Sequence, residues 1–315
     1  RMAWDERLDM TRLALNLSEH VNGVARRHAE VSRRMFPGYA VRAITNGVHV
    51  WTWASESFRS LYDAHLPGWC HEPEQLMHAD RIPDDQLQQA HSEAKVALLE
   101  QIRSVGGPAL DPTLPLLGFA RRMTPYKRPD LLFSHLERLK DIARRYPFQI
   151  VLAGKAHPHD DDGKLLIERL HAWAGELSAA VPIVFLAGYD MEIARLLVSG
   201  ADVWLNMPKR PLEASGTSGM KAALNGVPSL SVPDGWWLEG CIEGVTGWAV
   251  GGEADAENES DAVSLYDKLE GKVLPLYHGD RTGWTAVMKG AISRNASFFN
   301  SHRMMRRYAV EAYLR

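Results

Sequence analysis

Between residues 114 and 232 the sequence alternates between short apolar runs and longer amphipathic segments. The apolar runs are nearly continuous, as expected for strands buried on both faces of a parallel sheet; they are LPLLGFA (114–120), FQIVLAG (148–154), VPIVFLAG (181–188), ADVWLN (201–206) and VPSLSV (227–232). The segments between them have helical periodicity, at 129–146, 162–179, 190–199 and 215–226. This alternation predicts an α/β fold with a doubly wound parallel sheet flanked by helices.

The flanking regions are mostly helical in pattern. Residues 8–36 have apolar positions at near-helical spacing, but Asn22-Gly23 is a turn signal, so one helix and two helices remain equally open. A loop rich in Thr, Asn, Gly and Trp follows at 43–57, and residues 84–103 are predicted to form a helix. The last segment, 259–315, is predicted to contain helices only.

Composition and charge restrict the classes of protein to which this chain can belong. The chain has 315 residues, enough for one large or two modest domains at roughly 150 residues each. Lys and Arg number 36 against 39 Asp and Glu, a formal charge of −3, which argues against nucleic acid or an anionic membrane as partner. No apolar run approaches the roughly 18 residues that a membrane-spanning helix needs. The first residues lack the apolar stretch of a secretory signal.

The two cysteines, Cys70 and Cys241, lie far apart and form no CxxC motif. A disulfide framework and a cysteine-rich zinc site are therefore excluded, and we expect a cytoplasmic protein. The chain begins with Arg1 rather than Met, which suggests a fragment of a longer protein.

The loops after the predicted strands carry an unusual share of Lys, Arg, Gly and Ser, and ligands of doubly wound sheets bind there. In EASGTSGMK (213–221), small residues lead directly into a helical run, as in an anion cradle at a helix N-terminus. The segment is not a P-loop, because Gly216 and Gly219 are too close together and Ala222 follows Lys221. The alternative is an ordinary helix cap with a small-residue loop.

A second candidate anion site follows the strand at 114–120. Arg121, Arg122, Lys127 and Arg128 place four cations within eight residues. They either converge on an anion or lie solvated on a following helix; the prolines at 125 and 129 disfavour a regular helix and hence favour convergence. Two cradles suggest two phosphate groups.

Lys221 is the third element of this chemistry. A lysine beside a phosphate cradle can bond covalently to an aldehyde cofactor whose phosphate occupies the cradle. It can equally be a simple phosphate ligand. The residues alone leave both roles open.

Three further patterns have competing interpretations. His157, His159 and Asp160–Asp162 resemble a metal cluster, but short-loop ligands seldom converge and acidic residues cap helices, so we expect no metal. Trp51, Trp53, Trp236 and Trp237 could stack on sugar rings or fill the core. Arg303, Arg306 and Arg307 are expected to form a solvated face of the last helix.

Five strings together resemble the α-glucan (glycogen/starch) phosphorylases, in the shorter bacterial form: VNGVARRHAEVSRRMF, ITNGVHVWTW, GFARRMTPYKR, VLAGKAHP and EASGTSGMKAALNG. The similarity runs in order from about residue 8 to the C-terminus. It implies a GT-B fold of two Rossmann-like halves, with a pyridoxal 5'-phosphate cofactor. It also implies reversible phosphorolysis of terminal units of an α-1,4-glucan by inorganic phosphate, giving glucose 1-phosphate.

The resemblance assigns roles by position. The expected cofactor contacts are Lys221, which binds pyridoxal phosphate through its amine, Thr217, Ser218 and Arg121 at its phosphate, and the aromatic residues Tyr189 and Trp53. The expected substrate-phosphate ligands are Arg122 and Lys127, which count as catalytic together with Lys221. The expected glucosyl contacts are Glu213, Ser215 and Gly216, with Asn46 and Val24 around the 6-hydroxyl. In this family the cofactor phosphate exchanges a proton with the substrate phosphate, which protonates the glycosidic oxygen.

The nearest rival is a nucleotide-sugar glucosyltransferase of the same architecture. Those enzymes typically carry Glu-x7-Glu in this loop, whereas this sequence has Glu213-x7-Lys221. A lysine cannot accept hydrogen bonds from ribose hydroxyls, which favours the phosphorylase. A truncated, non-catalytic cofactor- or glucan-binding chain is the third possibility.

The resemblance also implies how the chain is divided. We expect a remnant of the N-terminal GT-B half at 1–45, linking loop and helices at 46–113, a Rossmann-like cofactor and phosphate domain at 114–290, and a C-terminal helix at 291–315. The family's glycine-rich phosphate loop and glucosyl-site histidine are not recognisable. We therefore expect the isolated chain to be weakly active or inactive unless a missing N-terminal half or another copy supplies the rest.

Overall fold

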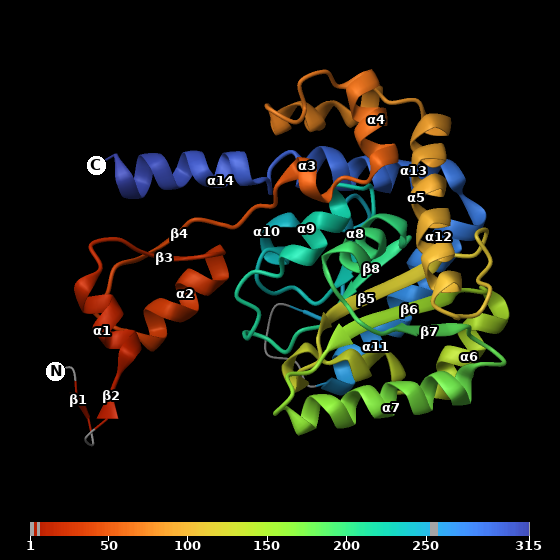
Figure 1. The fold of residues 1–315 in the computed structure, drawn as a ribbon, viewed down its shortest axis with the longest axis horizontal. Coiled ribbons are helices and arrows are strands. Elements are labelled where there is room, and N and C mark those ends of the chain that lie inside the picture. The colour runs from red at the N-terminus through yellow and green to blue at the C-terminus, as the bar shows by residue number, and fades with distance from the viewer. Residues whose placement is uncertain (1–2, 5–6, 253–257, 315) are drawn as a thin grey trace.

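The computed structural model describes residues 3–4, 7–252 and 258–314. Its centre is a six-stranded, fully parallel sheet in the order β10-β9-β8-β5-β6-β7 (Figure 1). The strands are β5 Leu116–Arg122, β6 Gln149–Lys155, β7 Ile183–Leu186, β8 Val203–Asn206, β9 Ser229–Ser231 and β10 Gly247–Ala249. This is the strand order of a Rossmann fold: β6 and β7 are added on one side of the first strand, β5, and β8, β9 and β10 on the other side, so the strand order reverses between β5 and β8. The predicted doubly wound α/β sheet is confirmed, and β10 is a strand that the apolar pattern did not reveal.

Helices cover both faces of the sheet, as right-handed crossovers require. The helices α6 Leu136–Arg145 and α7 Asp161–Leu177 follow β5 and β6 on one face, whereas α8 Met191–Gly200 and α9 Thr217–Ala223 follow β7 and β8 on the other (Figure 1). The long helix α5 Asp84–Ser104 packs against α8. The predicted helix at 129–146 is divided, because a 3-10 segment, Pro129–Phe133, precedes α6.

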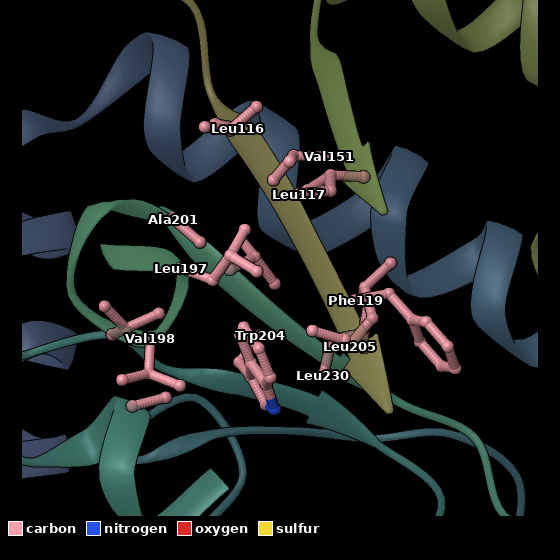
Figure 2. Packing of buried hydrophobic residues seen from close by; sticks show 14 of the residues in the cluster. Leu116, Leu117, Phe119, Val151, Leu197, Val198, Ala201, Trp204, Leu205 and Leu230 are labelled. Atoms are coloured by element: carbon pink, nitrogen blue, oxygen red, sulfur yellow. The ribbon is translucent and has the colours of Figure 1, made fainter. Parts of the chain in front are cut away.

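The core lies between the sheet and these helices. Leu197, Val198 and Ala201 lie against side chains of β5 and β8 such as Leu117 and Trp204 (Figure 2). A Cβ at Gly118 would lie 2.7 Å from the Cβ of Ala201, so the glycine permits the close approach of this segment to β5. Each fully buried large apolar side chain contributes roughly 1.5–3 kcal/mol to folding. This packing holds the carboxyl ends of β5 and β8 in fixed positions.

Residues 7–46 form a small unit beside the main body (Figure 1). It contains α1 Met10–Leu17, the strand β3 Val21–Gly23, α2 Arg26–Met35 and β4 Val41–Ala43, with β3 and β4 paired in parallel. Two helices therefore form at 8–36, and the Asn22-Gly23 turn signal lies in a short strand between them. The short pair β1 Ala3–Trp4 and β2 Arg7–Leu8 precedes them.

The remaining helical elements are α3 Val50–Trp53, α4 Glu56–His65, the 3-10 helices Pro73–Arg81 and Pro125–Lys127, α10 Trp237–Gly240, α11 Asn258–Lys268, α12 Leu274–Gly279, α13 Arg281–Gly290 and α14 Ser301–Tyr308, with π-helical turns at Leu269–Val273, Ala291–Ala296 and Ala309–Tyr313. The helical prediction for 259–315 agrees with the described residues, and residue 315 lies outside them. The expected C-terminal helix at 291–315 is interrupted between residue 296 and α14. Among the described residues, no helix is long and apolar enough to cross a membrane.

A buried ion cluster lies at the opposite end of the sheet from the loops that carry the candidate site. Asp202 pairs with Lys95 Nζ at 2.7 Å and His91 Nε2 at 3.0 Å, and it accepts a hydrogen bond from the backbone N–H of Leu116. Burial would raise the pKa of Asp202, but the Lys95 and His91 interactions outweigh it and lower the pKa to about 2. The cluster joins α5 to the beginnings of β5 and β8.

Candidate functional site

The candidate residues gather where β5 and β8 end, at the reversal of strand order. Open α/β sheets bind ligands at this point, because the loops leaving the two strands diverge and leave a crevice. β5 ends with Arg121 and Arg122, the segment after it contains Lys127 and Arg128, and the loop after β8 leads through Glu213 to α9. The two sequence motifs, about 90 residues apart, are therefore brought together by the sheet.

The centre of the site is a buried cluster of three charges. Glu213 Oε2 lies 2.6 Å from Arg121 Nη2 and 2.5 Å from Lys127 Nζ. The backbone N–H of Glu213 donates to Asp234 Oδ2 at 2.9 Å, which fixes the loop that carries the carboxylate. Burial would raise the pKa of Glu213, but the charges of Arg121 and Lys127 outweigh it and hold the pKa below its usual value. The carboxylate thus stays ionised and balances part of the positive charge.

The four cations after β5 do not all converge. Arg128 binds Met207 O, Pro208 O and Asp261 Oδ2, so it supports the loop after β8. Arg122 is exposed at the end of β5 and forms no ion pair with a described residue. The expectation of convergence is therefore correct for Arg121 and Lys127 and wrong for Arg128, which is occupied by carbonyls and a buried carboxylate. Arg122 remains available to a ligand.

Ser215 and Gly216 lead into α9, and residues 217–219 form its first turn. Gly216 precedes the helix with φ of +84°, a conformation that favours glycine, and a Cβ at Gly219 would lie 2.6 Å from the Trp236 ring. Trp204 Nε1 donates to Ser218 Oγ at 3.1 Å. Thr217 and Ser218 form the first turn of α9 and are partly exposed. Gly216 and Gly219 are thus required by backbone conformation and packing, whether or not the loop binds an anion.

Lys221 extends from α9 onto the aromatic face of Trp53. Its Nζ lies 3.5 Å from the centroid of the ring, a cation–π contact between residues from distant parts of the chain. Burial lowers the pKa of the Lys221 amine to about 8. At pH 7 about a tenth of the amine is therefore neutral, and the neutral amine is the form that can attack an aldehyde.

Unpartnered polar atoms show that the site has unused binding capacity. Arg121 Nη1 and Ser215 Oγ are buried without a hydrogen-bond partner, as is Asn206 Oδ1 at the end of β8. Leaving such groups unsatisfied costs about 1–3 kcal/mol each, so a ligand that binds them gains affinity. The donors Arg121 Nη1 and Ser215 Oγ fit an anionic group, and the partly neutral amine of Lys221 fits an aldehyde. Burial raises the pKa of Tyr189, and the charge of Arg121 partly offsets this rise.

Val24 and Asn46 come together in the N-terminal unit. The backbone N–H of Asn46 donates to Val24 O at 3.0 Å. On one side, Glu239 accepts hydrogen bonds from the Arg26 backbone N–H and from Thr45 Oγ1. On the other side, the Arg303 guanidinium donates to Thr45 O and Asn46 O at 2.7 and 2.9 Å. These contacts attach the Val24–Asn46 pair to the main body.

The structure revises several sequence interpretations. Trp236 and Trp237 are buried in the core, whereas Trp51 is 44% exposed. Arg303 binds backbone carbonyls, so only Arg306 and Arg307 remain on the expected solvated face. Asp160 accepts from the Gly163 N–H and caps α7. Within the described ranges, no three or more His, Cys, Asp or Glu residues are grouped to hold a metal ion.

Three residues that position the site were missed from the sequence: Asp234, Glu239 and Arg303. Asp234 lies in PDG, a typical turn signal, and the other two lie on short helices. Each of these residues has an ordinary local role, in a turn or a short helix, so the sequence around it gives no sign of a binding site. Only the fold shows that they hold the Glu213 loop and the Asn46 segment.

Comparison with known proteins identifies relatives across the chain. The family model described as carbohydrate phosphorylase matches residues 2–243. A maltodextrin phosphorylase of Thermococcus litoralis is 38% identical over 98% of this chain and 41% of its own length. Glycogen phosphorylases of Aquifex aeolicus and Mycobacterium tuberculosis are 40% and 35% identical over 98% of this chain, which spans 50% and 40% of their lengths. The chain thus spans about half or less of each of these relatives.

Proposed function

The chain belongs to the carbohydrate phosphorylase family, and on that premise we propose that it forms the cofactor-binding part of an α-glucan phosphorylase. The proposed reaction transfers the terminal α-1,4-linked glucosyl unit of a glucan to inorganic phosphate, giving glucose 1-phosphate. The observation that carries the proposal is Lys221, a half-buried amine on Trp53 in the helix α9, which follows the loop whose Glu213 pairs with Arg121 and Lys127. Pyridoxal 5'-phosphate is the proposed cofactor.

The residues present fit this cofactor. Lys221 would hold its aldehyde carbon through Nζ, because burial keeps part of the amine neutral. Arg121 Nη1, which is buried and unpartnered, would bind its phosphate together with Thr217 and Ser218. Trp53 and Tyr189 would line the ring. When bound, the cofactor supplies a phosphate group that acts as an acid and base toward the substrate phosphate.

The substrate phosphate is proposed to bind at Arg122 and Lys127. Lys127 is already oriented by Glu213, and the exposed guanidinium of Arg122 offers bidentate donors. The positive charges in this region offset the repulsion between two neighbouring phosphates. They also stabilise the charge that develops as the glycosidic bond breaks.

The glucosyl unit is proposed to contact Glu213, Ser215 and Gly216, with Val24 and Asn46 around its 6-hydroxyl. Ser215 Oγ is buried and lacks a partner, which supports a role in binding a hydroxyl group. The Glu213 carboxylate accepts from two cations through Oε2, which leaves Oε1 available as an acceptor for a sugar hydroxyl. We propose that the opposite wall of the cleft comes from a part of the protein beyond these residues.

Reductive trapping tests this proposal directly. Incubation with pyridoxal phosphate and borohydride, followed by peptide mapping, should place a pyridoxyl group on Lys221 and none at this position in Lys221→Ala. Arg122→Ala should keep the label but lose phosphate-dependent activity when assayed in the complete enzyme. An unlabelled Lys221 contradicts the cofactor assignment. Loss of the label in Arg122→Ala would show that the roles of the two phosphate sites are wrongly assigned.

A further inference from the structure

Asn225 follows the end of α9 and uses its whole side-chain amide for hydrogen bonds to backbone. It is 0% exposed. Its Nδ2 donates to Trp53 O at 2.8 Å and to Lys221 O at 3.0 Å, and its Oδ1 accepts from the Ser55 N–H at 2.8 Å. One buried amide thus contacts the backbones of both members of the Lys221–Trp53 pair.

These bonds satisfy groups that helix ends leave without partners. The last carbonyls of a helix have no partner within it, and Lys221 O and Trp53 O lie in the final turns of α9 and α3. The Ser55 N–H lies at the residue that caps α4. Because α3 and α9 are about 170 residues apart in sequence, their relative position near the amine depends on such a bridge.

We propose that Asn225 is a positioning residue that sets the Lys221 amine against the Trp53 ring, in the place and orientation that capture of pyridoxal phosphate requires. The inference rests on the proposed function, because it concerns the same amine. Asn225 is not among the proposed contacts to cofactor or substrate. It acts by fixing two backbone segments at once.

Tyr62 provides a matched structural control. Its Oη donates to Leu224 O at 2.6 Å, so it binds the residue next to Asn225 and is equally buried. Tyr62→Phe removes this bond without freeing Trp53 O or Lys221 O. If the loss of Asn225 merely weakens the end of α9, Asn225→Ala should therefore behave like Tyr62→Phe.

The experiment compares wild type, Asn225→Ala, Asn225→Asp and Tyr62→Phe in the whole chain. It measures the initial rate of pyridoxal phosphate trapping at Lys221 relative to the exposed Lys272 in the same digest, and the free energy of unfolding in urea. We expect Asn225→Ala to slow trapping about tenfold, because the amine and ring lose their common anchor. Tyr62→Phe should stay within about twofold of wild type at similar loss of stability. The pH midpoint of trapping should rise in Asn225→Ala, since a released amine is better solvated.

Asn225→Asp keeps the acceptor for Ser55 and removes both donors, so it tests the inference if the alanine variant does not fold. Trapping is compared at the high-pH plateau of each variant's own pH profile, so that neither the added carboxylate nor a higher pKa of the released amine affects the comparison. Equal trapping in the Asn225 variants and wild type, or an equal loss in Tyr62→Phe, overturns the positioning role and leaves the proposed function intact. An unlabelled Lys221 in wild type overturns both.

Discussion

Glu213 has a dual role at the scale of single residues. It neutralises Arg121 and Lys127 in a buried setting, and it is also the proposed contact to a glucosyl hydroxyl. The lowered pKa means that its carboxylate stabilises the fold above its unfolded pKa of about 4.3, and this stabilisation is lost as pH falls through the lower, folded value. The charge balance between Glu213 and the two cations therefore links the stability of the fold to the affinity of the site for anions.

Replacement of Glu213 tests this balance. Glu213→Gln keeps the shape and leaves two buried cations uncompensated, so we expect a loss of about 3 kcal/mol in the free energy of unfolding. Inorganic phosphate should restore more stability to the variant than to wild type, because an added anion replaces the missing charge. Urea unfolding with and without phosphate measures both effects. Glu137→Gln, at an exposed ion pair with Lys140, should have no measurable effect in either condition. An equal response of Glu213→Gln and wild type to phosphate would contradict the account.

At the scale of elements, the Asp202 cluster fixes where α5 meets the sheet. Asp202 receives Lys95 and His91 from one face of α5 and the N–H of Leu116 from the beginning of β5. Tyr277 Oη also donates to Asp202 Oδ1 at 3.3 Å, so the buried carboxylate has four partners, and removing the carboxylate would leave these groups unsatisfied. The helix and the strand are thus joined by charge as well as by apolar packing.

Acid unfolding should reveal this junction. The pKa of Asp202 is about 2 in the fold, below its unfolded value of about 3.9, so its stabilisation is present above about pH 4 and disappears as pH falls toward 2. The amount is on the order of 2 kcal/mol. At neutral pH the free energy of unfolding of Asp202→Asn should be about 3 kcal/mol lower than that of wild type. Between pH 4 and 2 it should fall less steeply than that of wild type, because the variant lacks the titrating carboxylate. Urea titrations at the three pH values test this, with the exposed Asp267→Asn as control. Parallel pH curves for Asp202→Asn and wild type would refute it.

The whole molecule consists of a Rossmann-like body and an N-terminal unit held against it by few polar contacts. Arg303 and Glu239 bind the 45–46 segment from two sides, and Asn22 Nδ2 donates to Tyr308 Oη on α14. In Figure 1, α14 extends away from the body over the N-terminal unit. The proposed 6-hydroxyl pocket therefore depends on how firmly this unit is attached.

Loosening of the attachment should be measurable by hydrogen exchange. Arg303→Met removes the donors to Thr45 O and Asn46 O, so the amide protons of Ile44 and Asn46 should exchange about tenfold faster. The amide of Ile150, within β6, should not change. Arg306→Met removes only an exposed pair with Glu74 and serves as control. Unchanged exchange at residues 44 and 46, or an equal increase at Ile150, would show that Arg303 does not hold this unit.

The strands and most helices of the body could be predicted from local patterns, because buried parallel strands are continuously apolar and their crossover helices are amphipathic. β10 was missed because Gly247–Ala249 is short and contains a glycine. The motifs around Lys221 and Arg121 could be recognised in the sequence from their residue types. The hydrogen bonds of Arg128 to backbone carbonyls could not be predicted, because a sequence does not show which groups a cation contacts.

The sequence by itself determined the alternation of strand and helix, the resemblance to the phosphorylases, and the residue types that can bind phosphate and an aldehyde. Tertiary structure alone decided which of the four cations face Glu213, that the Lys221 amine lies on Trp53, and that one amide at Asn225 links them. The physical reason is the distance along the chain over which each effect acts. Periodicity and turn chemistry act over a few residues, whereas burial, charge pairing and pKa depend on groups that only folding brings within a few ångströms.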